Sequence, residues 1–201
     1  ANSDAGVINW REIEDIIVKI IIIFFQYIDF RLDKIKINRI ENNNGKIEVV
    51  AVNNPGDRAD FAHLLKYDSV HGRFDAKISV NDDKIIINDK PIHFFTEFDP
   101  EKIAWSSFDV DIVIDATGIF KDKAGLGKHL GDSVKKVIMC APGQDLDGTF
   151  VMGINHEKYD SASHHIVSNA SCTTNCLAPI AKVLNDKLTP INVHQGSHKK
   201  V

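Results

Sequence analysis

The sequence predicts an α/β protein with a mainly parallel sheet and helices on both of its faces. Two observations support this class. After residue 46, short apolar runs of strand length alternate with helix-like segments, as parallel strands joined by helical crossovers do. The chain has 201 residues, of which 43% are hydrophobic and 26% charged, and this is enough for the core of one large domain or slightly more.

The segment 1–47 differs in amino-acid composition from the rest of the chain. It is rich in Ile, Asn, Lys and Phe, and its only glycines are Gly6 and Gly45. Apolar residues at helical spacing predict a helix over 9–30, capped by Asn9, although the β-branched run 20–23 is equally compatible with a buried strand. We interpret the block as an insertion or an altered opening segment.

The remaining elements follow in a regular order. Strands are expected where apolar runs end at Asn, Asp or Gly, and helices where apolar residues recur at helical spacing. The predicted strands are 46–52, 77–80, 84–87, 92–95, 110–116 and 136–140; helices are predicted at 59–66 and 178–184, with 126–130 inside a helical connection and turns at 81–83 and 88–89.

Charge and cysteine content exclude several classes of function. The formal net charge of −4 gives no reason to expect the basic stripe of a protein that binds nucleic acid. Three cysteines, Cys140, Cys172 and Cys176, form neither a disulfide framework nor a metal-ligand pattern, so we expect a cytoplasmic protein without a metal site. The apolar run 16–25 is too short to cross a bilayer and contains Lys19, so we expect no membrane span.

The stretch 168–179 (SNASCTTNCLAP) indicates a nucleophile. It places Cys172 among small polar residues directly before a helix-like run. A helix N-terminus favours the thiolate, which is the reactive form of cysteine. The alternative is a buried, inert thiol, which is the usual state of a free cysteine. Cys176, one helical turn later, is expected to serve packing.

This stretch closely resembles the active-site signature of the glyceraldehyde-3-phosphate dehydrogenases. The resemblance continues through VVAVNNP (49–55), LKYDSVHGRF (65–74), DATGIF (115–120) and FVMGINHEKY (150–159), and it covers residues 48 to about 188. It implies a Rossmann-like NAD-binding domain over 1–170, with 1–47 atypical, and the beginning of a truncated α+β catalytic domain over 171–201.

The resemblance also implies an activity. Such enzymes of glycolysis oxidise glyceraldehyde 3-phosphate with NAD and inorganic phosphate to 1,3-bisphosphoglycerate, through a thioester on the cysteine. The nucleophile would be Cys172, the base His194, and the phosphate-binding residues Ser171 and Thr173. His194 lies only 22 residues after Cys172 and is alternatively a solvated residue, while Ser171 and Thr173 are alternatively helix-capping hydroxyls.

The resemblance assigns Asn54, Thr117, Gly118 and Cys140 to the NAD site. Asn54 stands where the family commonly has aspartate, and it lacks the charge that disfavours a 2′-phosphate, so the preference for NAD over NADP is weakened. Thr117 and Gly118 are alternatively a plain turn, and Cys140 alternatively only packs. A homo-oligomer, a tetramer in the family, is also implied. The competing hypothesis is a catalytically silent nucleotide-binding or protein-interaction module that keeps the scaffold.

Overall fold

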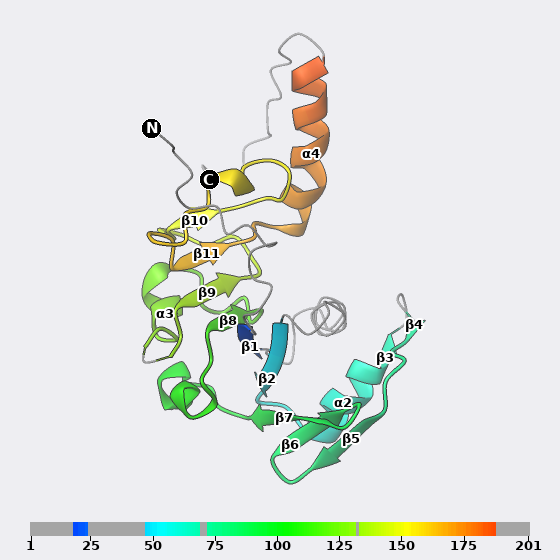
Figure 1. The fold of residues 1–201 in the computed structure, drawn as a ribbon. Helices are drawn as coiled ribbons and strands as arrows, with labels where there is room; N and C mark the ends of the chain where they lie inside the picture. Colours follow the sequence, from blue (N-terminus) through cyan, green and yellow to red (C-terminus); the bar gives the residue numbers. More distant parts are fainter. Residues whose placement is uncertain (1–17, 24–46, 69–71, 132, 188–201) are drawn as a thin grey trace.

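A nine-stranded, mainly parallel sheet forms the centre of the molecule (Figure 1). This computed structural model describes residues 18–23, 47–68, 72–131 and 133–187, the first of these ranges as backbone. The strands of the sheet are β1 (Val18–Ile23), β2 (Ile47–Asn53), β5 (Ile78–Asn81), β6 (Lys84–Ile87), β7 (Lys90–Phe95), β8 (Ile112–Asp115), β9 (Lys136–Met139), β10 (Gly148–Thr149) and β11 (Ile166–Ser168). Two short strands, β3 (Tyr67–Asp68) and β4 (Gly72–Arg73), pair separately. The predicted α/β class is confirmed.

The strand order is that of a doubly wound, Rossmann-type sheet. It runs β10-β11-β9-β8-β1-β2-β7-β6-β5, with every pair from β10 to β7 parallel. The chain moves outward from β1 through β2 to β7, then returns to the other side of β1 and moves outward through β8 and β9 to β11. The order therefore reverses between β1 and β8, and ligands of such sheets bind at the carboxyl ends of the strands beside that switch point.

Strand β1 corrects one prediction. The helix expected over 9–30 is wrong for residues 18–23, which form the strand between β2 and β8. A β-branched run suits this central position, because an interior parallel strand is covered on both faces. The other residues of the predicted helix, including Asn9, lie outside the described residues.

The helices begin at side-chain caps. Helix α2 (Arg58–Lys66) starts after Asp57, whose Oδ1 accepts hydrogen bonds from the N–H groups of Ala59 and Asp60 at 2.8 and 3.1 Å. Helix α3 (Lys123–Gly127) is capped by Asp122 and ends before the predicted range 126–130 does. Helix α4 (Cys172–Lys187) contains the predicted 178–184 and begins six residues earlier. Three 3-10 turns, η1 (Pro100–Lys102), η2 (Trp105–Phe108) and η3 (His156–Lys158), complete the elements of the described residues.

A β-bulge in β2 changes which of its residues face each of the two core clusters. Val50 is the extra residue, since Val49 pairs with Ile20 and Ala51 with Ile21. Val49 and Val52 consequently pack in the cluster that contains Phe61 and Leu65 of α2, whereas Ala51 packs in the cluster that contains Trp105 of η2 and Leu126 of α3. The two clusters confirm that helical segments cover both faces.

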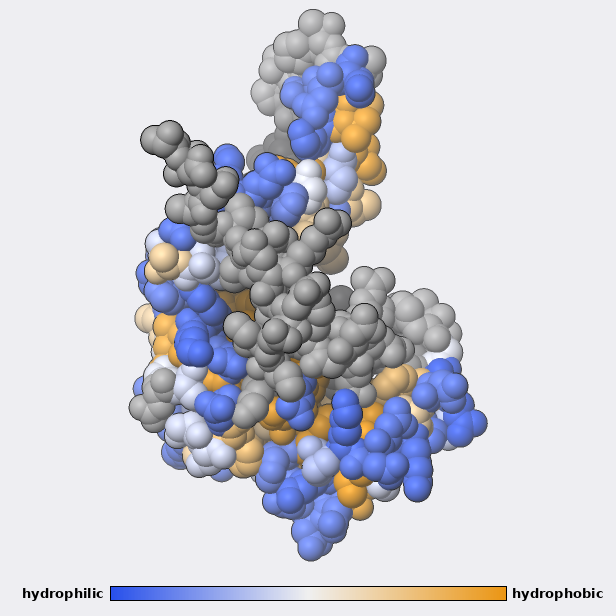
Figure 2. Space-filling model, in the orientation of Figure 1, coloured by the Kyte–Doolittle hydropathy of each residue, from blue (hydrophilic) through white to orange (hydrophobic). Residues whose placement is uncertain are grey.

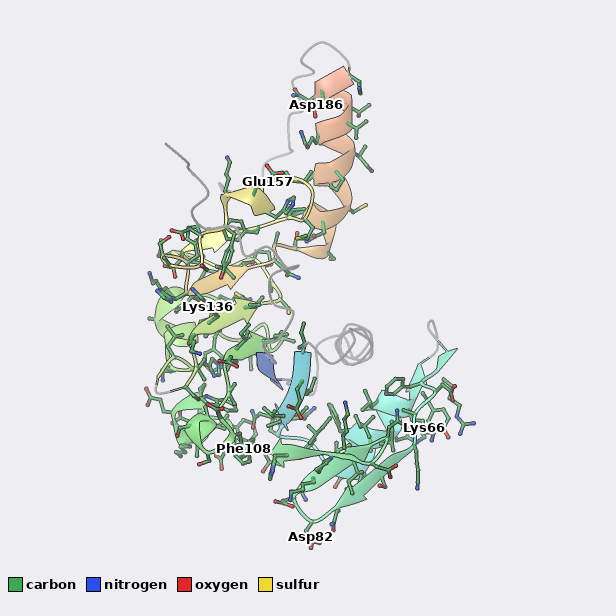
Figure 3. All side chains as sticks on the ribbon, viewed as in Figure 1. Lys66, Asp82, Phe108, Lys136, Glu157 and Asp186 are labelled. Atoms are coloured by element: carbon green, nitrogen blue, oxygen red, sulfur yellow. The ribbon has the colours of Figure 1, made fainter. Side chains whose placement is uncertain are left out.

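An antiparallel meander extends the sheet beyond β7. The turn between β6 and β7 consists of Asn88 and Asp89 with φ values of 50° and 68°, and two successive left-handed residues are characteristic of a tight hairpin. This turn and the one at 81–83 were both predicted. Phe108 of η2 packs on the rings of His93 and Phe95, two residues of β7, and so holds this strand in place (Figure 3).

Helix α4 projects from the sheet beyond β10 and β11 (Figure 1). None of its residues is buried, and a strip of apolar side chains is visible along it (Figure 2). The large apolar side chains exposed on it are Leu177, Ile180, Val183 and Leu184. In the part of the chain that the structure describes, no helix has the length and apolar character needed to span a membrane.

Candidate functional site

One row of paired residues marks the carboxyl edge of the sheet. The row consists of Phe95, Asn53, Ile23, Asp115, Met139, Ser168 and Thr149, each in register with its neighbour. Neighbouring strands lie about 4.8 Å apart, so the row extends roughly 19 Å from β2 to β11. The predicted site residues Asn54, Thr117, Gly118, Cys140, Ser171, Cys172 and Thr173 all follow strands of this row within a few residues. The structure therefore collects them along one edge.

Asn54 lies at the end of β2 and is buried, with 2% of its surface exposed. Its Oδ1 accepts a hydrogen bond from Gly56 N–H at 2.8 Å, and its own N–H donates to the carbonyl oxygen of Phe95 at 2.9 Å. A hollow of about 250 Å³ adjoins it, lined by Asn54, Gly56, Asp57, Asp60, Phe61, His63 and Leu64. The remaining hydrogen-bonding group of the side chain is the Nδ2 amide, which can donate to a hydroxyl or a phosphate oxygen.

The turn after β8 is held by the side chain of Asp115. Asp115 Oδ1 accepts hydrogen bonds from Thr117 N–H at 2.8 Å and from Thr117 Oγ1 at 2.7 Å. Thr117 Oγ1 in turn accepts from Ile119 N–H at 3.1 Å. Thr117 is wholly buried, whereas Gly118, with φ +63°, is half-buried at the edge. The hydroxyl of Thr117 is therefore used within the turn, and the backbone around Gly118 is the part that a ligand can reach.

The loop before α4 is tied to the end of β9. Ser168 Oγ donates to the carbonyl oxygen of Ala141 at 2.6 Å and accepts from Ala170 N–H at 2.9 Å. Asn169 N–H donates to the carbonyl oxygen of Met139 at 3.1 Å. Cys140, half-buried, lies between Met139 and Ala141, the two residues that anchor this loop, and so borders the loop that leads to Cys172.

Cys172 is the first residue of α4 and its thiol is exposed. The predicted position at a helix N-terminus is confirmed, and the alternative of a buried thiol is not. The unpaired backbone N–H groups of a first helical turn favour a negative charge beside them. Cys176 is also exposed, which corrects its expected packing role: α4 buries none of its residues in the described structure.

Ser171 caps α4. Its Oγ accepts a hydrogen bond from Thr174 N–H at 3.0 Å and lies 2.9 and 2.7 Å from the hydroxyl oxygens of Thr173 and Thr174. Asn175 Nδ2 donates to the carbonyl oxygens of Asn169 and Ser171 at 2.7 and 3.0 Å. Three hydroxyl groups are thus gathered at one helix start, and they can donate to an anion.

Asp147 supports β11, the strand that leads to this loop. Its Oδ2 accepts hydrogen bonds from the N–H groups of His165 and Ile166, both at 2.8 Å, and its Oδ1 pairs with Lys123 of α3. Burial alone raises the pKa of Asp147, but the hydrogen bonds from Lys123, Ile166 and His165 outweigh burial and hold the pKa at about 2. Just before the same, amino end of β11, Lys136 donates to the carbonyl oxygens of Ser161 and His164 (Figure 3).

His194 lies outside the described residues, so its predicted role as base stays a prediction. Within the ranges that the structure describes, no cluster of three or more His, Cys, Asp or Glu side chains could hold a metal ion. The cysteines are all free.

Sequence reasoning missed three residues that shape this edge. Asn53 clamps β2 to the segment after β7, because its side chain exchanges two 2.9 Å hydrogen bonds with the backbone of Glu97. Asp115 and His129 are buried together beneath the turn after β8. The sequence does carry a signal for Asn53 and Asp115, because each is a polar residue at the end of an apolar strand. A polar side chain that is buried there needs a hydrogen-bond partner in the protein or a ligand.

The fold and this edge define a Rossmann-type α/β protein whose sheet leads directly into a helix headed by a cysteine. The family model described as glyceraldehyde 3-phosphate dehydrogenase, NAD binding domain, matches residues 31–123. That range begins inside the segment 1–47, whose amino-acid composition differs from that of the rest of the chain.

Curated relatives extend the match. Glyceraldehyde-3-phosphate dehydrogenase 1 of Bacillus cereus is 55% identical over 145 residues, which are 72% of this chain and 43% of the relative. The glyceraldehyde-3-phosphate dehydrogenase of Geobacillus stearothermophilus is 54% identical over 144 residues, with the same two shares. That of Streptomyces coelicolor is 53% identical over 140 residues, or 70% and 42%. The chain belongs to the glyceraldehyde-3-phosphate dehydrogenase family and spans about 43% of the length of these relatives.

Proposed function

We propose that this chain is the nucleotide-binding part of an NAD-dependent, phosphorylating glyceraldehyde-3-phosphate dehydrogenase and carries its nucleophile, Cys172. The single observation that supports this most strongly is the row at the carboxyl edge, which aligns Asn54, the Thr117–Gly118 turn, Cys140 and the loop before Cys172. An extended ligand that lies along this row reaches from the end of β2 to the start of α4.

The residues present fit a dinucleotide at three strands of the row, β2, β8 and β9. At β2, the amide of Asn54 can donate to a ribose hydroxyl. After β8 and β9, Gly118 and Cys140, both half-buried, border the nicotinamide side. NAD, when bound, accepts a hydride from the substrate.

The chain's own residues supply the covalent chemistry. The sulfur of Cys172 bonds to the aldehyde carbon, and the carbonyl oxygen takes up a proton, which gives a thiohemiacetal. His194 then removes that hydroxyl proton as the hydride leaves the same carbon, and a thioester remains on Cys172. An oxygen of inorganic phosphate attacks the thioester carbon, the C–S bond breaks, and 1,3-bisphosphoglycerate leaves as the thiolate is restored. The hydroxyls of Ser171 and Thr173, gathered at the start of α4, bind phosphate.

The cellular location and the assembly of the protein are part of the same proposal. Free thiols at all three cysteines suit the reducing cytoplasm. The four exposed apolar side chains of α4 need a cover, and assembly into a homo-oligomer, a tetramer by resemblance, together with further catalytic-domain structure would supply one.

A specific observation favours a second candidate, a silent nucleotide-binding or interaction module. The turn after the first strand of a Rossmann sheet is normally rich in glycine, because a Cβ there blocks close approach of the backbone to the pyrophosphate. In this chain no glycine occurs from Phe24, which follows β1, to Asn44. A site with reduced pyrophosphate contacts binds nucleotide more weakly and positions it less well.

Two measurements on the same chain separate these candidates. Thermal unfolding with millimolar NAD reports binding, because a ligand that binds only the folded state raises the midpoint by mass action. Mass spectrometry after rapid quenching with NAD and glyceraldehyde 3-phosphate, in the absence of phosphate, reports the thioester. We expect acylation of the native chain and of Cys176→Ser, and none of Cys172→Ser. NAD binding without acylation would identify a silent nucleotide-binding module, and an unchanged midpoint would reject the dehydrogenase and favour the interaction module.

A further inference from the structure

Asn175, in the first turn of α4, directs its side chain back to the loop before the helix. Its Nδ2 donates to the carbonyl oxygen of Asn169 at 2.7 Å and to that of Ser171 at 3.0 Å. Its backbone N–H donates to the same Ser171 oxygen at 2.9 Å. The side chains of an α-helix tilt toward its N-terminus, and this is why residue 175 can reach back across the start of α4. One residue thus makes three hydrogen bonds to the segment directly before Cys172.

The orientation of this amide follows from its partners. Both partners are carbonyl oxygens, which only accept hydrogen bonds, so the NH2 group and not Oδ1 must face them. Between the two carbonyl groups lies Ala170, whose φ of 63° is in the left-handed region. A non-glycine residue keeps that conformation only where its surroundings enforce it. The amide of Asn175 therefore bridges the turn at Ala170 from one side to the other.

The bonds to Ser171 also fix the peptide unit that contains the N–H of Cys172. A trans peptide unit directs its C=O and its N–H in opposite directions. Because the Ser171 oxygen faces Asn175 along α4, the Cys172 N–H is directed away from the helix, over its open N-terminal end. The exposed thiol belongs to the same residue.

The start of α4 depends on hydrogen bonds of this kind. In the described structure none of the residues of α4 is buried, so core packing does not hold the helix. Ser171 Oγ caps the N–H of Thr174 inside the first turn. The bond from Asn175 to Asn169 does something different, because it joins the helix to the chain on the far side of the turn.

We propose that Asn175 is a positioning residue for the nucleophile: its amide bridges the carbonyl groups of Asn169 and Ser171 and so holds Cys172 at the head of α4. The inference rests on the proposed function for the reaction of Cys172 with an aldehyde, and on this chain's geometry for the position of that residue. Asn175 acts through the backbone, because both hydrogens of its amide are used on carbonyl oxygens.

A matched pair of variants on one helix tests this role. Asn175→Ala removes the two side-chain hydrogen bonds to the loop. Asn185→Ala makes the same change on the last turn of α4, where the side chain of Asn185 bonds the neighbouring Asp186. Alanine is a better helix former than asparagine, so both variants keep α4 helical. Asn175→Asp has nearly the native shape but offers only acceptor oxygens at neutral pH, and we expect it to lose what Asn175→Ala loses.

Alkylation tests the inference without nucleotide or substrate. We expect iodoacetamide to react with Cys172 about threefold more slowly in Asn175→Ala than in Asn185→Ala, because a displaced residue loses the stabilisation of its thiolate by the helix start. The rate at Cys176 should differ by less than about twofold, since that residue lies beyond the first turn. Equal rates at Cys172 in the two variants would refute positioning. Equal slowing at both cysteines would also overturn it, because the whole helix would then have loosened.

Acylation by glyceraldehyde 3-phosphate and NAD separates the inference from the proposed function. We expect the limiting rate of acylation to be about tenfold lower in Asn175→Ala than in Asn185→Ala, because a misplaced nucleophile reacts slowly. The affinity for NAD and the half-saturating substrate concentration should agree within about twofold, since Asn175 affects the nucleophile and not the binding of either ligand.

The outcomes for the two proposals differ. If even the native chain is not acylated but the difference in alkylation appears, Asn175 positions Cys172 and the proposed function fails. If the native chain and both variants are acylated at equal limiting rates, the proposed function stands and positioning fails. If Asn175→Ala does not fold, Asn175→Asp takes its place with the same expected loss of acylation, and an unchanged rate in that variant would reject the inference.

Discussion

Ser168 donates its hydroxyl hydrogen to the carbonyl oxygen of Ala141 at 2.6 Å, and this bond joins the loop before Cys172 to the loop after β9. The same hydroxyl oxygen accepts from Ala170 N–H, and Ala170 has a left-handed backbone with φ 63°. A non-glycine residue adopts that conformation only where its surroundings enforce it. Ser168 therefore determines both where the chain leaves the sheet and how it turns into α4.

Ser168→Ala tests this relationship. The substitution leaves the carbonyl oxygen of Ala141 and the N–H of Ala170 without their partner, and we expect a loss of about 1–3 kcal/mol in the free energy of unfolding. Urea denaturation measures it. The control is Ser163→Ala, whose exposed hydroxyl bonds Asp160 at the surface and whose removal should cost below about 0.5 kcal/mol. Equal losses in the two variants would contradict the role given to Ser168.

Reactivity along α4 provides a second prediction. Cys172 and Cys176 are both exposed on the same helix, so they differ chiefly in distance from its N-terminus. The helix terminus stabilises an anion by about 0.3–1 kcal/mol, and the effect fades within the first turn. We expect iodoacetamide to alkylate Cys172 roughly two- to fivefold faster than Cys176, measured by peptide mass spectrometry in Cys176→Ser and Cys172→Ser respectively. Equal rates would remove the support for an activated nucleophile.

The N-terminal cap of α4 provides a third prediction. In Ser171→Ala, Thr174 N–H loses its acceptor, which costs about 1 kcal/mol at a helix start. Because α4 has no buried residue to compensate, we expect local opening: the Thr174 amide should exchange about fivefold faster with solvent. Thr173→Ala is the matched control, since its hydroxyl contacts only Ser171 Oγ among the bonds described. A similar acceleration in the control would show that Ser171 is not the cap.

How far the sequence predicts this molecule depends on the range of the interactions involved. Periodicity located β2, β5 to β9 and α2 because it records which face of each element is buried. It did not resolve residues 18–23, since a run of isoleucines satisfies a helix and a buried strand equally; pairing with β2 and β8 decides between them. Motif resemblance singled out Cys172 and Gly118, which the structure places at the start of α4 and after β8. It did not find Asp115 and His129, which are 14 residues apart and meet only through the fold.

Asn54 supplies a fourth prediction, on the choice of cofactor. Asn54→Asp keeps the Oδ1 acceptor for Gly56 N–H, so the turn should be retained while a negative charge is added. A 2′-phosphate near that charge is repelled, and at an effective dielectric constant of about 20 such repulsion exceeds 1 kcal/mol. We expect the affinity for NADP relative to NAD to fall about tenfold, measured by calorimetry with both nucleotides. Asp57→Asn, beside the same hollow, should shift the ratio the other way or leave it unchanged.

Asp147 supplies the last prediction, a dependence of stability on pH. Its pKa is about 2 in the folded chain against an ordinary value of 3.8, because hydrogen bonds from Lys123, Ile166 and His165 outweigh the opposing effect of burial. A lowered folded-state pKa means that the contribution is complete above the ordinary value and is lost as pH falls through the folded value. The side chain is only 11% exposed, and the shift corresponds to about 2 kcal/mol.

Asp147→Asn isolates this contribution. The native chain should be more stable than the variant by about 2 kcal/mol near neutral pH, and the difference should decline between about pH 4 and about pH 2. Urea denaturation across that range measures it. In Asp111→Asn, which breaks a surface pair, the loss near neutral pH should stay below about 1 kcal/mol. If Asp147→Asn kept its full deficit at the acid end, the charge of Asp147 would contribute nothing, because protonation of the native carboxylate would then have cost no stability.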